Sequence, residues 1–169
     1  LLGGSLAIMA GITEVAKAED HYIQPGTYWR DVNDVLANTQ PKDRVFLMDG
    51  EHIIAFEQNA HYVIPERNSN IYFGGESEEN RNSVIIKLQE DNNNGTLIDI
   101  FAPNILLGNM TLQGPASAGV HFRGENASQG VLERINANDL GTVAVWDNYY
   151  NEHNAKPSFI FKDINIKRT

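Results

Sequence analysis

The sequence contains no cysteine, and this absence excludes disulfide bonds and thiolate metal sites. For an exported protein, it favours a bacterial host over a small domain held together by disulfides. The five histidines show none of the spacings typical of zinc sites. A phosphate-binding glycine loop and a nucleophile elbow are also missing. The sequence therefore gives no support to a zinc enzyme, a nucleotide-dependent enzyme or an α/β-hydrolase.

Positive charge is scarce, with 13 basic residues against 22 acidic residues and a net charge of −9. We exclude nucleic acid as a partner, because phosphate binding requires clustered cations. A polyanionic sugar would need a cation or a local basic patch to bind. The chain nevertheless has 169 residues with 41% apolar content, which is enough for one domain with a hydrophobic core.

The apolar run at residues 1–12 is too short to span a bilayer comfortably, which takes about 20 residues. Ala16, Lys17 and Ala18 then match the small-x-small pattern that precedes a signal-peptidase cut. We predict that residues 1–18 are a secretory signal peptide with an incomplete start; a buried helix or a membrane anchor is the alternative. The mature chain would be secreted or periplasmic, and free of the membrane.

Residues 19–43 contain the best helix signal of the sequence, at residues 28–38. Thr27 is the candidate N-cap, and Pro41 follows the expected end. From Arg44 onward, short strand-like segments alternate with Gly, Asn, Pro or Asp. The helix is amphipathic because its apolar residues share one face: Tyr28, Val32, Val35 and Leu36.

Apolar positions recur at a regular interval in the strand region. An interval of roughly 22 to 29 residues with two or three strands is typical of a solenoid, in which each turn buries its apolar residues against its neighbours. One set aligns Leu107, Leu132 and Phe161, then Met110, Ile135 and Ile164 at +3, and Thr111, Asn136 and Asn165 at +4. A second set, at spacings of 22 and 23 residues, aligns Ile98 and Ile100, Val120 and Phe122, and Val143 and Val145.

These patterns predict an all-β protein, a right-handed parallel β-helix over residues 44–169 with the helix capping its N-terminal end. A β-sandwich is the alternative, because it also has many short strands at regular spacing. The recurrence of apolar positions across a whole turn, rather than across adjacent strands, counts against the sandwich.

Several stretches resemble the pectin lyase-like superfamily of β-helix proteins, which includes pectate lyases, polygalacturonases and pectin methylesterases. An amphipathic helix followed by DRVFLMDGEH and NIYFGGESEENRNSVII is the usual opening of such domains. The layout of APNILLGNMTLQ, AGVHFRGENA and VLERINANDLGTVAVW is most similar to the pectin methylesterases. The resemblance implies a β-helix that acts on polysaccharides.

The sequence departs from that family at the expected catalytic position. Where the esterases carry Gln-Asp-Thr-Leu-Tyr, this chain has residues 142–146, with Val143 at the aspartate position. Valine cannot act as acid, base or nucleophile, so we predict no pectin methylesterase activity, and the catalytic residues stay unknown. The final FIFKDINIKRT lacks the polar cap that a solenoid end requires, which suggests a C-terminal truncation.

Strand alternation predicts a polar row on the outside of the turns. If Ile98, Val120 and Val143 point inward, the outward positions on successive turns hold Asp99, His121 and Ala144, with Phe101, Arg123 and Trp146 beside them. We expect Asp99 to bond to His121 and Arg123 to lie against Trp146. The alternative is an ordinary polar strand face without function. The predicted substrate-binding residues are Asp99, His121, Arg123, Trp146, Asp147 and Tyr149.

The predicted function is a secreted, carbohydrate-active β-helix protein that acts on or binds a polysaccharide, of lyase or hydrolase type if catalytic. The alternative is a non-catalytic adhesin or glycan-binding protein. We expect a monomer with a polysaccharide or cell-surface glycan as its partner. No cofactor is assigned; calcium is an option at two acidic loops, Ser77–Asn80 and Gln89–Gly95, although no fixed ligand spacing is visible.

Overall fold

The computed structural model describes residues 17–89, 95–147 and 157–169. The predicted signal peptide up to residue 16 and Tyr149 lie outside these residues, so their predictions stay untested. The strands are β1 (Asp20–Ile23), β2 (Arg44–Leu47), β3 (Gly50–Ile54), β4 (Tyr62–Ile64), β5 (Tyr72–Gly74), β6 (Val84–Leu88), β7 (Thr96–Ile100), β8 (Ile105–Arg123), β9 (Gln129–Asp147) and β10 (Ser158–Lys167). The helices are α2 (Trp29–Asn38) and the short 3-10 helix η1 (Glu78–Asn82).

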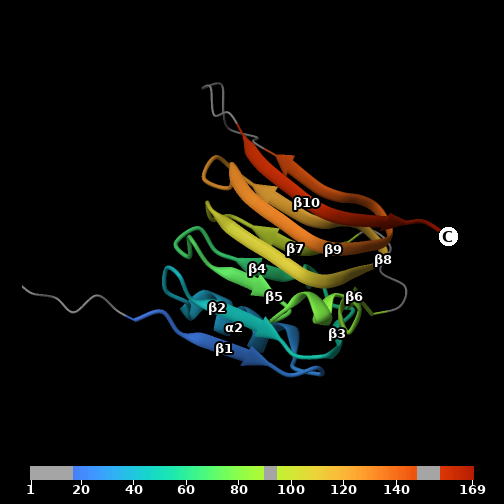
Figure 1. The fold of residues 1–169 in the computed structure, drawn as a ribbon, viewed down its shortest axis with the longest axis horizontal. Coiled ribbons are helices and arrows are strands. Elements are labelled where there is room, and N and C mark those ends of the chain that lie inside the picture. Colours follow the sequence, from blue (N-terminus) through green and yellow to red (C-terminus); the bar gives the residue numbers. More distant parts are fainter. Residues whose placement is uncertain (1–16, 90–94, 148–156) are drawn as a thin grey trace, which may run out of the picture.

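The protein is mainly β, with ten strands in one curled sheet that runs from β1 at one end to β10 at the other (Figure 1). Every strand pair among the described residues is parallel. Along its length, β8 pairs successively with β5, β6 and β7, and on its other side with β9. The antiparallel pairing that a β-sandwich requires does not occur in this part of the chain.

The register confirms the first set of recurring positions. Leu107 pairs with Leu132 and Leu132 with Phe161, and the same holds for the positions three and four residues later. In the second set, Ile98 pairs with Val120 and Ile100 with Phe122, as expected. These apolar side chains recur because each packs against its equivalent in the neighbouring strand.

The long strands bend at single residues with positive φ. Asn109, Arg134 and Asp163 have φ of 55°, 52° and 56° and occupy the same place in β8, β9 and β10. A left-handed conformation is costly for residues other than glycine, and Asn and Asp tolerate it best. Three stacked residues in this conformation turn the sheet at one corner, which lets the strands curl around the core.

One predicted register is wrong by one residue. Val120 pairs with Ala144, and Phe122 pairs with Trp146, so Val143 and Val145 are not the partners of Val120 and Phe122. Val143 nevertheless packs against the hydrophobic core. The cause is a register shift between Gln113 and Ala116, where β8 contains one more residue than β9. An added residue exchanges the two faces of every position beyond it, because side chains alternate along a strand.

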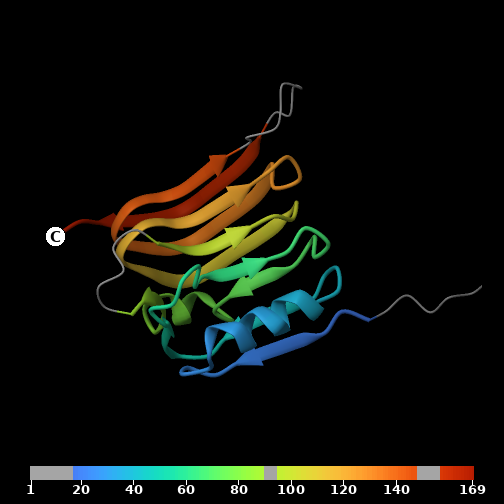
Figure 2. The same cartoon turned by 180° about the vertical axis from the view of Figure 1, so that it is seen from behind.

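The helix forms one residue shorter than predicted and covers the β1 end of the sheet, where it lies beside β4 (Figure 2). It buries Trp29, Val32 and Leu36, whereas Tyr28 is 41% exposed. The predicted N-cap is wrong: the cap position is Tyr28, and the Thr27 hydroxyl donates to the carbonyl of Gln24 instead.

The side chain of Asn33 forms hydrogen bonds with the backbone at β4 that a neighbouring strand would otherwise form. Its amide nitrogen donates to the carbonyl of His61 at 3.0 Å, and its oxygen accepts from the backbone N–H of Val63 at 2.8 Å. Buried backbone groups need such partners.

At the end of the sheet opposite β1, β10 exposes apolar side chains, namely Ile160, Phe161 and Ile166.

Candidate functional site

Asp99 in β7 is a carboxylate with only 2% of its surface exposed. Its Oδ2 accepts a hydrogen bond from Arg123 Nε at 2.6 Å and lies 3.2 Å from His61 Nε2. Its Oδ1 is buried and has no partner among the described residues. A buried carboxylate oxygen without a partner costs free energy, so Asp99 is not explained by packing alone.

His121 and Asp147 form a second pair next to Asp99. His121 Nε2 lies 3.1 Å from Asp147 Oδ2. The backbone register places His121 beside Asp99, as predicted, and Asp147 beside Arg123. The predicted bond between Asp99 and His121 is wrong, because Asp99 bonds to Arg123 and His121 to Asp147. We call Asp99, Arg123, His61, His121 and Asp147 the outer cluster.

Trp146 does not belong to this cluster. It pairs with Phe122 in the inward row, is half-buried and packs against the hydrophobic core. The predicted contact between Arg123 and Trp146 is wrong for the same reason as the register, since the extra residue in β8 turns Trp146 inward. Its indole Nε1 is buried without a partner in the described structure.

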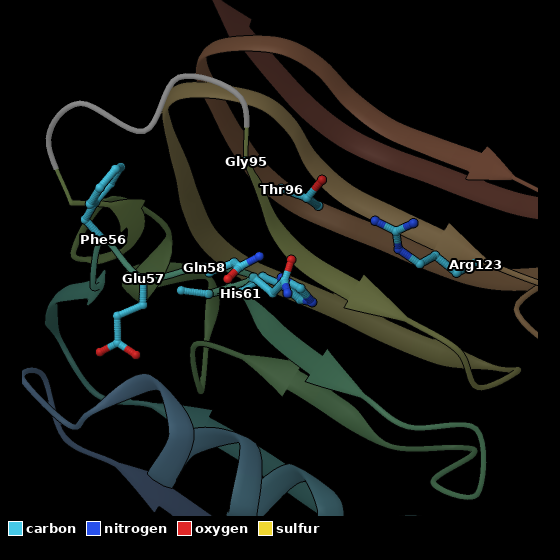
Figure 3. A pocket seen from close by; sticks show the side chains of 9 residues that line it. Phe56, Glu57, Gln58, His61, Gly95, Thr96 and Arg123 are labelled. Carbon is cyan, nitrogen blue, oxygen red and sulfur yellow. The ribbon is translucent and has the colours of Figure 1, made fainter.

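A cavity of about 520 Å³ adjoins the outer cluster (Figure 3). The Arg123 guanidinium points toward its middle from one side, and His61 and Thr96 lie between Arg123 and Phe56. The terminal nitrogens of Arg123 make no hydrogen bond to the residues that the structure describes; its only such bond runs from Nε to Asp99. The lining residues are Phe56, Glu57, Gln58, Asn59, Ala60, His61, Gly95, Thr96 and Arg123.

Glu57 belongs to the cavity wall but is engaged elsewhere. Its carboxylate accepts from the Tyr28 hydroxyl at 2.6 Å and from Arg30 Nη2 at 3.1 Å, and Figure 3 shows it turned toward the helix. The hydrogen bond from Tyr28 lowers the pKa of Glu57, and Arg30 adds to this effect. Phe56, in contrast, stands at the edge of the cavity with 63% of its surface exposed.

Sequence reasoning missed His61 and Phe56. His61 has the same strand alternation as Val63, which pairs with Asp99 in the outward row. Extending that alternation back from β4 would have found His61. The signal was hidden because Tyr62 and its partner Ile98 are 36 residues apart, an interval well outside the repeat of roughly 22 to 29 residues. Phe56 lies in a loop, where no periodicity applies.

The calcium prediction finds no support in the described ranges, which contain no group of three or more His, Asp or Glu side chains able to hold a metal ion. In the first acidic loop, Asn80 accepts from the Ser77 backbone N–H and donates to Asp49. Its side chain therefore holds the turn together. Residues 90–94 of the second loop lie outside the described residues.

Through His61 and Arg123, which line the cavity, the outer cluster can donate and accept hydrogen bonds there. No helix in the described residues combines the length and apolarity needed to cross a membrane.

Comparison with protein-family models, curated proteins and solved structures finds no match for this chain.

Proposed function

We propose that residues 44–169 form the turns of a right-handed parallel β-helix similar to the pectin lyase-like superfamily, with α2 covering the first turn. The parallel register and the stacked apolar positions support this interpretation. A solenoid explains why one strand, β8, can pair with three earlier strands in sequence order, because each turn lies on the previous turn.

On this fold, the protein is a secreted polysaccharide-binding β-helix whose sugar site is the outer cluster and its cavity. The observation that carries the proposal is Arg123, which Asp99 holds through Nε while the terminal nitrogens have no hydrogen-bond partner among the described residues and face the cavity. An oriented guanidinium can donate two parallel hydrogen bonds to a ligand. Phe56, across the cavity, offers an apolar face for a sugar ring.

Binding is favoured over catalysis by the composition of the site. The cavity wall contains an imidazole, a guanidinium, neutral polar groups and the Glu57 carboxylate, which is held by Tyr28 and Arg30. No nucleophile oriented by a base is present among the described residues. Val143 excludes the esterase chemistry that the family resemblance would suggest. A polysaccharide lyase or hydrolase is the second candidate, favoured by the His61–Asp99 contact of 3.2 Å, which orients an imidazole toward proton transfer.

The test is retention on immobilised pectin, pectate, alginate and a neutral glucan, with methanol and unsaturated products measured in parallel. Arg123→Gln keeps a donor for Asp99 but loses the guanidinium, and Phe56→Ser removes the exposed ring. We expect each variant to lower retention about tenfold, the equivalent of one good contact. Lys87→Gln is the matched control, because Lys87 in β6 forms its ion pair with Glu51 of β3 and is not among the residues that line the cavity.

Wild-type retention that is unchanged in both variants would refute the sugar site. If the wild-type protein releases unsaturated product and Arg123→Gln releases it at the same rate, the function must lie in another part of the chain. Methanol release would contradict the absence of esterase activity that Val143 predicts.

A further inference from the structure

The charges around the cavity favour one class of sugar. The outer cluster contains one guanidinium, Arg123, and two carboxylates, Asp99 and Asp147. The guanidinium and the two carboxylates together give one net negative charge. The whole chain has a net charge of −9, so the background potential also opposes an approaching anion.

The other wall residues do not change this balance. Glu57 is neutralised by Arg30, with which it forms an ion pair at 3.1 Å. Gln58, Asn59 and Thr96 supply amide and hydroxyl groups without charge. The described cavity wall therefore contains a single cation, and Asp99 already compensates it at 2.6 Å.

We propose that this cavity binds neutral hexosyl units and discriminates against acidic sugars at neutral pH. The inference rests on the proposed polysaccharide function. Arg123, Gln58 and Asn59 would donate to hydroxyl oxygens, and the Phe56 ring would cover an apolar sugar face. The site discriminates against the carboxylate of an acidic sugar because Asp99 and Asp147 repel it at the point where Arg123 would otherwise attract it.

The experiment compares polymers that share a backbone and differ in charge. One pair is a neutral glucan and its carboxymethylated derivative, and the other is fully methyl-esterified and fully de-esterified homogalacturonan. Affinity is measured at about pH 7.5, in low and in high salt. We expect the neutral member of each pair to bind about five- to tenfold more tightly at low salt, and the difference to shrink at high salt.

Asp147→Asn tests whether the local carboxylate is responsible. It should raise the ratio of acidic-polymer affinity to neutral-polymer affinity about threefold to fivefold. Glu51→Gln removes the same charge from an exposed position of β3, outside the outer cluster, and should leave this ratio unchanged. Equal gains in both variants would mean that total charge, and not the cavity, repels the acidic sugar.

The two proposals fail in different ways. Tighter binding of the acidic members would overturn the neutral-sugar inference and leave the polysaccharide site standing. Absence of binding to all four polymers would refute the proposed function, and this inference with it. His121→Gln checks that the Asp147 effect does not come from a disturbed fold, because it removes the partner of Asp147 while retaining its charge; we expect discrimination to persist.

Discussion

Two polar clusters cross successive strands of this protein, and they differ in how completely their hydrogen bonds are made. In the first, which we call the corner cluster (Arg81, Thr111, Asn136 and Asp163), Arg81 donates to the side chains of Asn136 and Asp163 and to the carbonyls of Ile135 and Asp163. In the outer cluster, Asp99 Oδ1 and the terminal nitrogens of Arg123 have no such partners among the described residues.

The difference separates a structural cluster from a candidate binding site. Arg81 is 9% exposed and ties η1 to β9 and β10, and its carbonyl accepts from Thr111 Oγ1 at 2.7 Å. Every nitrogen of its guanidinium has a partner, as expected for a buried cation that stabilises the fold. The outer cluster has hydrogen-bonding groups beside a cavity that have no partner among the described residues. A ligand in the cavity is the simplest partner for them.

The largest expected effect breaks the corner cluster. Arg81→Met removes all four hydrogen bonds and leaves the Ile135 carbonyl without its charged donor, so the free energy of unfolding should fall by about 2–3 kcal/mol. Arg123→Gln should cost less than about 1 kcal/mol, because glutamine can still donate to Asp99. Urea unfolding measures both. Equal losses would mean that the outer cluster is as structural as the corner cluster.

His52 is a buried polar residue that belongs to neither cluster. Its proton binding makes the free energy of unfolding depend on pH. His52 is 1% exposed, bonds to the Met48 carbonyl at 2.8 Å, and burial lowers its pKa. The unfolded chain therefore binds a proton more readily than the folded chain. This contribution leaves stability intact above about pH 6.5 and reduces it as the pH falls below that value.

The measurement is the unfolding free energy at about pH 7.5 and about pH 5. His52→Gln keeps a donor for Met48 but does not titrate, so the difference in unfolding free energy between the two conditions should shrink. His21→Gln is the control for a histidine that already contacts a carboxylate, Asp43, at 3.1 Å. An unchanged pH dependence in His52→Gln would contradict the role of burial.

The smallest expected effect concerns Trp146, which lies beside Phe122 in the inward row and does not belong to the outer cluster. Trp146→Phe keeps a ring in the inward row and removes a buried N–H without a partner, so stability should change by less than about 0.5 kcal/mol. Polysaccharide retention should not change. A marked loss of retention with intact stability would return Trp146 to the sugar site.

The pattern of apolar residues was sufficient to predict much of the fold. It predicted a β protein, one helix near residues 28–38, and the pairing of Leu107 with Leu132 and of Asp99 with His121. These predictions succeeded because burial repeats wherever equivalent positions stack, and because strand alternation assigns each residue to a face.

Part of the candidate site could not be predicted from the pattern. The partners of Asp99 are Arg123 and His61, and a long interval of chain separates His61 from its neighbours in space. Side-chain reach across two strands, and not register alone, decides these bonds. The aromatic residue at the cavity is Phe56 from a loop, whereas the sequence pointed to Trp146.

The sequence by itself determined which positions are apolar, how often they recur and that positive charge is scarce, since these are properties of composition and spacing. Only the tertiary structure decided the parity of residues 142–147, because one added residue between Gln113 and Ala116 exchanges the faces beyond it. It also decided which carboxylate meets which cation. Such contacts depend on the three-dimensional distance between side chains, which sequence separation does not contain.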